Sequence, residues 1–185
     1  MKNVIKAPNK ILRKKIPYTT DIDQRYTVIS QDMFKIIKQD SVAGLAANQI
    51  GYEVPMIAIK IPEQAGEVNK VLFIINPEIV ETKGTISFRE KCLSLPGVTC
   101  VTERYREVRV KGMDLHGQYI SKRFRGITSV VVQHEIDHLH GRLMTDHGTI
   151  VEQKRVKNEE ENKRSTGDIQ RGKGINKSDG NVTLH

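Results

Sequence analysis

The sequence has no tryptophan, and aromatic residues make up only 5% of its 185 residues. Proteins that bind single-stranded nucleic acid stack the bases on aromatic rings, so this chain is poorly supplied for that function. It has two cysteines, too few for a disulfide scaffold, and no run of about 18 apolar residues that would predict a transmembrane helix. We therefore expect one globular domain with reduced cysteines and no membrane span.

The N-terminal residues Met1–Lys10 lack the apolar stretch of a secretory signal peptide and the arginine- and serine-rich composition of a transit peptide. This predicts a cytoplasmic protein without a membrane partner. The net charge of +8 permits attraction to a polyanion such as RNA, and it is equally consistent with simple solubility. Because aromatic residues are scarce, we expect no sequence-specific recognition of nucleic acid.

The spacing of apolar residues predicts two helices. The first covers residues 21–40, and the second covers residues 128–140, with Thr128 or Ser129 as its N-cap and Gly141 just after its end. The expected strands are residues 54–61, 70–77, 78–82, 84–88, 107–111 and 119–124, with a hairpin turn at 112–117. Because strands and helices do not alternate, this order predicts an α+β fold of mixed, largely antiparallel β-strands packed around the second helix as a central element.

The chain is expected to divide near residue 150. Residues 1–150 contain the apolar periodicity of a compact domain, whereas residues 151–164 predict a C-terminal helix with few apolar residues to dock it. Residues 165–185 are rich in Gly, Asn, Ser and Lys and have almost no apolar periodicity, which predicts a disordered tail.

The second predicted helix carries the sequence His134-Glu-Ile-Asp-His138. Histidines four residues apart lie about 40° apart on a helix, so both imidazoles can bind one metal ion. Glu135 is rotated by about 100° from His134 and would lie beside the ion, where a base that deprotonates water is needed. Buried histidines without partners would cost about 1–3 kcal/mol each, so metal binding explains this pattern better than chance.

A catalytic metal site usually takes three protein ligands, and the helix supplies only two. Cys92, which lies upstream, would offer a thiolate that suits a transition metal. His147 and Glu152 are downstream alternatives, and they would favour an HExxH peptidase that cleaves internal peptide bonds. His140 lies about 200° around the helix from His138 and faces away.

Three segments follow one another along the chain: Gly44–Gly51 (GLAANQIG), Glu90–Ser94 (EKCLS) and Gln133–His138 (QHEIDH). Taken together, they resemble the ordered motifs of the peptide deformylases. The resemblance identifies residues 1–150 as a peptide deformylase-like catalytic domain. It implies a metal-dependent hydrolase that removes the formyl group from the N-terminal formylmethionine of newly made polypeptides.

The resemblance also implies the metal centre. Cys92, His134 and His138 would bind one metal ion per chain, with water completing the site. The implied metal is ferrous iron (Fe2+), with zinc (Zn2+) or nickel (Ni2+) as substitutes. Glu135 would be the catalytic residue that takes a proton from water and returns it to the leaving amine.

The substrate side of the implied site comes from the other two motifs. Gln49, through its side chain, and Leu93, through its backbone N–H, would donate hydrogen bonds to the oxyanion, and Gly44 would line the substrate site. The implied substrates are N-formylmethionyl nascent peptides. The ribosome is a further candidate partner, because nascent chains must be met there.

The sequence departs from the usual family pattern at two places. Val42 and Lys91 stand where the family usually has glycine, and both positions would flank the substrate groove, so they bear on substrate preference. Asp137 is expected to pair with Arg104 and so tie the Cys92 segment to the helix, and Cys100 is expected to be a small core residue.

Two alternatives remain open from the sequence. One is the HExxH metallopeptidase that cleaves peptide bonds, which differs in its third ligand. The other is a basic ribosome-associated protein with a structural metal, although a structural site would need four protein ligands and the sequence offers three good ones.

Overall fold

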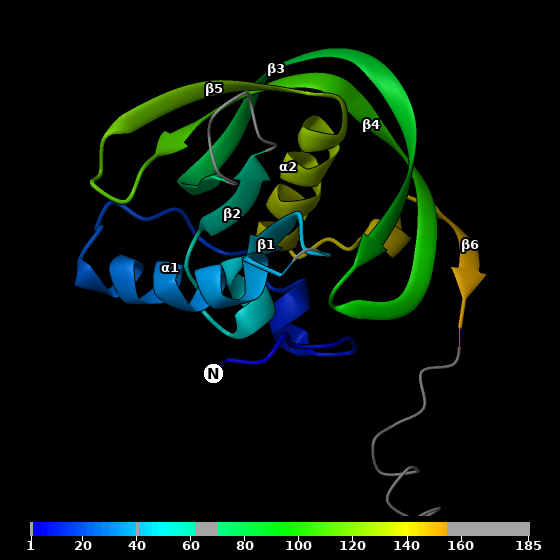
Figure 1. The fold of residues 1–185 in the computed structure, drawn as a ribbon, viewed down its shortest axis with the longest axis horizontal. Helices are drawn as coiled ribbons and strands as arrows, with labels where there is room; N and C mark the ends of the chain where they lie inside the picture. Colours follow the sequence, from blue (N-terminus) through cyan, green and yellow to red (C-terminus); the bar gives the residue numbers. More distant parts are fainter. Residues whose placement is uncertain (1, 40, 62–69, 155–185) are drawn as a thin grey trace, which may run out of the picture. The chain divides into compact units, whose positions relative to one another are not determined.

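The computed structural model describes residues 2–39, 41–61 and 70–154. Two α-helices, α1 (Gln24–Ile37) and α2 (Gly126–Leu139), combine with strands β1 (Gly44–Ala46), β2 (Met56–Ile61), β3 (Lys70–Cys92), β4 (Leu95–Met113), β5 (Tyr119–Arg125) and β6 (Thr149–Gln153). Short 3-10 helices span Lys10–Arg13, Ala47–Ile50 and Met144–Asp146. The strands form one sheet in the order β1-β2-β3-β4-β5, with β6 on β4, and each of these pairings is antiparallel (Figure 1). The predicted α+β class is therefore confirmed.

Helix α1 forms where the first helix is predicted, within residues 21–40. Its N-cap is Asp23, whose side chain accepts a hydrogen bond from the backbone N–H of Arg25 at 2.8 Å. One face is buried, and its apolar members are Tyr26, Ile29, Met33, Ile36 and Ile37. This face packs against the sheet, so the spacing of its apolar residues reflects the packing of the folded protein.

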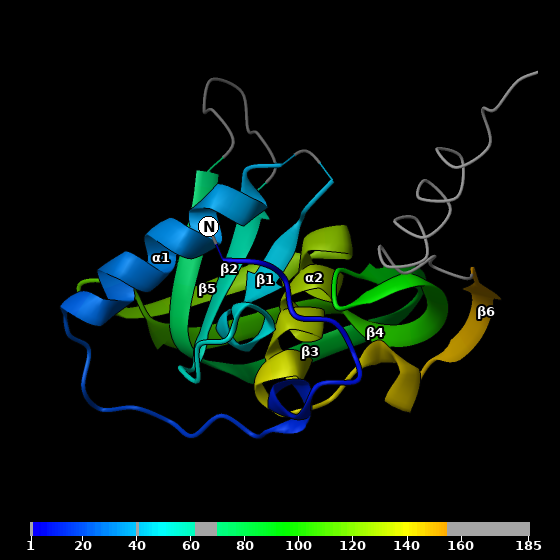
Figure 2. The same cartoon turned by 90° about the horizontal axis from the view of Figure 1, so that it is seen from below.

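Strand β2 is apolar on both faces because a helix packs against each of them. Met56 and Ala58 belong to a core cluster with residues of α1, whereas Ile57 and Ile59 belong to a second cluster with Val132, Ile136 and Leu139 of α2. Figure 2 shows α1, then β2 and β1, then α2 in succession across the view. The second cluster holds α2 against the sheet, and α2 carries the chemistry described below.

The expected strands 70–77, 78–82 and 84–88 are a single strand, β3, in the structure. The expected boundary at Asn76 and Pro77 is a bulge: the register with β4 shifts between Ile75 and Glu78, and Asn76 has a φ of 51°. A bulge bends a strand without ending its pairing. Strands β3 and β4 therefore form one long hairpin that curves around α2 (Figure 1). The first half of β4 and the short β1 were not predicted.

Helix α2 begins earlier than predicted, and its N-cap differs. The N-cap is Arg125, which makes no side-chain capping bond, while Ser129 lies inside the helix and donates its hydroxyl to the carbonyl of Tyr105 at 2.9 Å. The predicted end is correct, because Gly141 adopts a φ of 69° just after the helix. A Cβ at Gly141 would lie 2.5 Å from the carbonyl oxygen of Arg13, so the N-terminal segment also requires a glycine there.

The predicted C-terminal helix over residues 151–164 is wrong where it can be compared. Residues 151–153 belong to strand β6, which pairs with the start of β4. Residues 155–164 and the predicted tail, 165–185, lie outside the described residues. Of the helices in the described ranges, none has the length and apolar character needed to cross a membrane.

Candidate functional site

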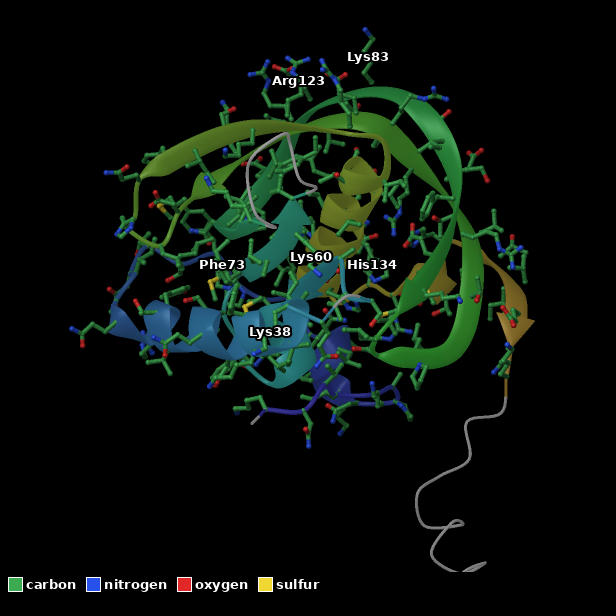
Figure 3. All side chains as sticks on the ribbon, viewed as in Figure 1. Lys38, Lys60, Phe73, Lys83, Arg123 and His134 are labelled. Atoms are coloured by element: carbon green, nitrogen blue, oxygen red, sulfur yellow. The ribbon has the colours of Figure 1, made fainter. Side chains whose placement is uncertain are left out.

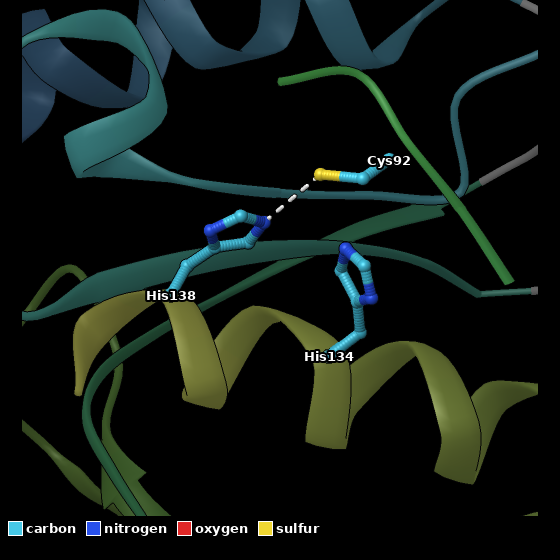
Figure 4. Close-up of side chains that lie close together, drawn as sticks. All are labelled: Cys92, His134 and His138. Carbon is cyan, nitrogen blue, oxygen red and sulfur yellow. Dashed lines mark hydrogen bonds between the residues drawn. The ribbon is translucent and has the colours of Figure 1, made fainter. Parts of the chain in front are cut away.

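Cys92, His134 and His138 converge on one point in the interior of the domain (Figure 4). Their candidate ligand atoms all lie within 4.8 Å of one another, and all three residues are buried. The Cys92 sulfur is 3.2 Å from Nε2 of His138. The two histidines stand one turn apart on α2, and Cys92 ends β3, so the curved β3–β4 hairpin brings the thiol over the helix.

Glu90 fixes the orientation of His134. Its Oε2 lies 2.6 Å from Nδ1 of His134, and its other contacts are the guanidinium of Arg104 and the hydroxyl of Thr102. Burial would raise the pKa of Glu90, but the hydrogen bonds from His134 and Arg104 outweigh it and hold the pKa well below its usual range. The carboxylate can only accept, so Nδ1 of His134 carries the proton and Nε2 is left free to bind a metal.

Arg104 joins the cysteine segment to the helix, as predicted. It lies between Glu90, two residues before Cys92, and Asp137 on α2, with a distance of 2.5 Å from its Nη1 to Oδ2 of Asp137. Arg142 pairs with the other oxygen of Asp137 from the surface side, at 2.5 Å. The predicted pair of Asp137 and Arg104 is thereby confirmed, and it is buried.

Glu135 lies beside the cluster and is deeply buried. Burial raises the pKa of its carboxyl to about 7, and Oε2 has no hydrogen-bond partner among the described residues. Gly44 of β1 lies directly against it: a Cβ at Gly44 would be 2.7 Å from Oε1 of Glu135 and 2.6 Å from Cγ1 of Val131. The small-residue segment therefore allows β1 to approach α2 closely, which places the edge of β1 next to the carboxylate.

Gln49 and Leu93 lie on the cysteine side of the cluster. Gln49 is buried, its Oε1 accepts from the backbone N–H of Ala46 at 2.8 Å, and its Nε2 donates to the Ser94 hydroxyl at 3.2 Å and lies 3.7 Å from the Cys92 sulfur. Leu93 occupies the turn between β3 and β4 and is half-buried. Both residues thus neighbour the candidate metal ligands.

The N-terminal arm ties these two segments together. The backbone N–H of Ile5 donates to the carbonyl of Gln49 at 2.7 Å, and that of Ala7 donates to the carbonyl of Ser94 at 2.9 Å. Between them, the ammonium of Lys6 donates to the carbonyl of Leu93 at 2.6 Å.

A cavity of about 580 Å³ opens onto the cluster. Its walls include Gly44, Gln49, Cys92, His134 and Glu135. Apolar side chains make up much of the remaining wall, among them Val42, Phe88, Leu95, Ile127, Val130 and Val131. The arrangement is that of a substrate pocket with a few polar groups gathered at one place.

The other ligand candidates lie elsewhere in the described chain. His140 is exposed, and its ring nitrogen contacts the carbonyl of Ile136. His147 lies 3.8 Å from Asp137, and Glu152 on β6 contacts Thr99 and Lys154. None of the three joins Cys92, His134 and His138 in the group of described residues able to hold a metal.

Two further residues were not identified from the sequence. They are Glu90 and Ser94, which entered the sequence analysis only as members of the EKCLS motif. Cys100, in contrast, is the buried core residue that was expected, and burial raises the pKa of its thiol. The signal for Glu90 was a carboxylate two residues before a candidate thiolate ligand. A carboxylate that contacts the second ring nitrogen of a metal-binding histidine fixes the orientation of that ring.

The donor set fits a transition-metal ion. One thiol and two imidazoles form the kind of mixed sulfur and nitrogen set that binds zinc or iron, and three protein ligands leave a position for substrate or water, as in catalytic sites. The proton position on His134, set by Glu90, leaves the correct nitrogen facing the cluster.

The chain is similar to known proteins over most of its length. The family model for polypeptide deformylase matches residues 1–156. A peptide deformylase of Aquifex aeolicus (strain VF5) is 34% identical over 146 residues, which cover 79% of this chain and 86% of that protein. A peptide deformylase of Syntrophobacter fumaroxidans is 37% identical over 139 residues, which cover 75% of this chain and 81% of that protein.

A solved structure is also similar. The crystal structure of a peptide deformylase from Legionella pneumophila superposes with a TM-score of 0.73 and 28% identity, covering 94% of this chain and 99% of that one. The chain therefore belongs to the peptide deformylase family, the enzymes that remove the formyl group from N-terminal formylmethionine.

Proposed function

We propose that the chain performs this hydrolysis with Cys92, His134 and His138 as ligands of one ferrous ion, for which zinc or nickel can substitute. The observation that carries the proposal is the cluster of these three buried donors, two of which, Cys92 and His134, line a cavity of about 580 Å³ together with the buried carboxylate of Glu135. A bound divalent ion supplies Lewis-acid chemistry, which lowers the pKa of water and polarises the formyl oxygen.

Glu135 is the proton carrier in this proposal. Its carboxylate takes a proton from the attacking water and delivers it to the amine that leaves when the formyl C–N bond breaks. Its burial beside His134 and the close approach of Gly44 restrict the carboxylate to the pocket side of α2. A nearby divalent ion would counteract the effect of burial on its pKa, which keeps the group ionised before reaction.

Gln49 and Leu93 stabilise the oxyanion that forms on the formyl group. The amide nitrogen of Gln49 lies 3.7 Å from the Cys92 sulfur, and its oxygen is fixed by the N–H of Ala46, so the donor side faces the cluster. The backbone N–H of Leu93 is the second donor. Removal of one such donor typically raises the barrier by about 2.7–4 kcal/mol.

Gly44 contributes its backbone at the substrate edge. Because it has no side chain, β1 packs directly against Val131 and Glu135 of α2, which brings the backbone of β1 next to the carboxylate. The apolar wall that includes Val42, Ile127 and Val130 suits the methionine side chain of the substrate. We place this activity in the cytoplasm, with newly made formylmethionyl chains as substrates and the ribosome as the place where they are met.

The test is formate release from formyl-Met peptides by protein purified without oxygen and loaded with ferrous iron. We expect formate in proportion to free N-terminal methionine, and no hydrolysis of the matched acetyl-Met peptides. Cleavage of internal peptide bonds without formate release would instead support the peptidase. The iron form should lose activity in air faster than a zinc form, because ferrous iron and a thiolate both oxidise.

A further inference from the structure

The rim of the active-site cavity carries an excess of positive charge. Lys6, Lys91 and Lys154 line it, and all three are exposed, whereas Glu152 is the acidic residue on the same wall. The carboxylate of Glu90, deeper in the cavity, is already paired with Arg104. A substrate entering the pocket therefore passes a cationic rim.

Lys91 and Glu152 lie in one row across three strands. Lys91 of β3 is opposite Thr99 of β4, and Thr99 is opposite Glu152 of β6. Residues opposite one another on antiparallel strands share a face, so the three side chains line the same wall. Thr99 donates its hydroxyl to Glu152 at 3.3 Å, and Lys154 lies 3.0 Å from the other oxygen of Glu152.

Lys154 and Thr99 are the direct contacts of Glu152, and Lys91 acts on this carboxylate only through its charge, which helps to lower the pKa of Glu152. Among the described residues, Lys91 takes part in none of the ion pairs, while Lys154 is paired with Glu152 and Lys6 donates to the carbonyl of Leu93. Lys91 is also the residue directly before the candidate ligand Cys92. Its position in the chain places a free cation at the mouth of the cavity.

We infer that the chain prefers formylmethionyl peptides that carry an aspartate or glutamate in the first residues after methionine. This rests on the proposed function. An extended peptide advances about 3.3 Å per residue, so the second and third residues of a substrate lie about 7–10 Å from the formyl group. Lys91 is exposed on the cavity wall directly before Cys92, so these residues of the substrate pass on the side of the cavity where it lies.

The effect is modest because the charges are exposed. Exposed ion pairs correspond to about a one- to fivefold change in affinity, and such attraction weakens as the Debye length falls from about 10 Å at 0.1 M salt to about 3 Å at 1 M. We therefore expect an acidic peptide to exceed the matched basic peptide about two- to tenfold in kcat/KM at low salt. The difference should largely disappear at 1 M salt.

The experiment compares three amidated peptides, formyl-Met-Ala-Asp-Ala, formyl-Met-Ala-Asn-Ala and formyl-Met-Ala-Lys-Ala, with the iron-loaded enzyme. The expected order of kcat/KM is Asp, then Asn, then Lys. Lys91→Glu should reverse the order, and Lys91→Met should flatten it. The matched control is Lys83→Glu, which changes the net charge equally in the middle of the same strand, away from His134 (Figure 3).

Calorimetry with the deformylated product peptides gives the same comparison without turnover. An unchanged ratio of acidic to basic affinity in Lys91→Glu would overturn the inference, and so would an equal shift in Lys83→Glu. Absence of formate release, with the product peptides still ranked by charge, would overturn the proposed function and leave only the charge preference of the cavity supported.

Discussion

Oε2 of Glu90 lies 2.6 Å from Nδ1 of His134, and Glu90 stands two residues before Cys92 on the same strand. One short segment of β3 thus supplies a candidate metal ligand and also orients a second ligand that belongs to α2. Arg104 completes this connection, because it contacts both Glu90 and Asp137. The position of the thiol relative to the two imidazoles therefore depends on a buried charged network.

Arg104→Met should destabilise the domain strongly. The substitution removes the cation between two buried carboxylates, and loss of one partner of a buried pair typically costs about 3–5 kcal/mol. Denaturant unfolding measures this loss. Arg142→Met is the matched control, because Arg142 contacts the same Asp137 with its side chain 59% exposed, and an exposed pair is worth about 0–1 kcal/mol. Equal losses in the two variants would contradict the network.

Gly44→Ala should lower both stability and activity. The added methyl would lie within 2.6–2.8 Å of Val131 and Glu135, and overpacking of this kind costs about 1–3 kcal/mol. The unfolding free energy and formate release are measured together. Val131→Ala opens space beside the methyl, so the double variant should regain stability beyond the sum of the single effects. Strict additivity would show that the two residues do not collide.

Cys92→Ser should keep the fold and lose most of its metal. A neutral hydroxyl replaces the thiolate poorly as a ligand of a transition metal. Metal content after desalting and far-UV circular dichroism are the measurements. Cys100→Ser is the control, since Cys100 is also buried but lies outside the group of candidate ligands. Full metal in Cys92→Ser, together with loss in His147→Ala, would move the third ligand to His147.

Local patterns in the sequence predicted part of this site. The positions of His134, Glu135 and His138 follow from the period of one helix, and the end of α2 at Gly141 follows from the backbone freedom of glycine. Asp137 was expected to pair with Arg104, because Asp137 lies on the polar strip of the helix and Arg104 follows Cys92 by twelve residues. The predictions on α2 depend on one short segment in which local conformation is decided by nearby residues, whereas the Asp137–Arg104 pair joins residues 33 apart in the chain.

Other features that depend on distant segments were missed. Glu90 is 44 residues from His134, and only the curved β3–β4 hairpin brings them together. The sequence predicts a strand boundary at Asn76 because a proline follows it. In the structure β3 continues through a bulge there, because its pairing with β4 continues on both sides. Residues 151–153 form a strand because they pair with the edge of β4. The spacing of apolar residues within this segment does not predict that pairing.

The measurement that tests the account most directly is formate release by Glu135→Gln, made together with metal analysis. The amide has nearly the shape of the carboxylate, so Cys92, His134 and His138 should keep a full metal content and the melting temperature should stay near the parent value. The proton carrier is removed, and general acid–base assistance is typically worth about 10²–10⁴-fold, so turnover of formyl-Met peptides should fall at least about a hundredfold. A variant with full metal and parental turnover would contradict the role of Glu135, and a variant without metal would make Glu135 a ligand in place of Cys92.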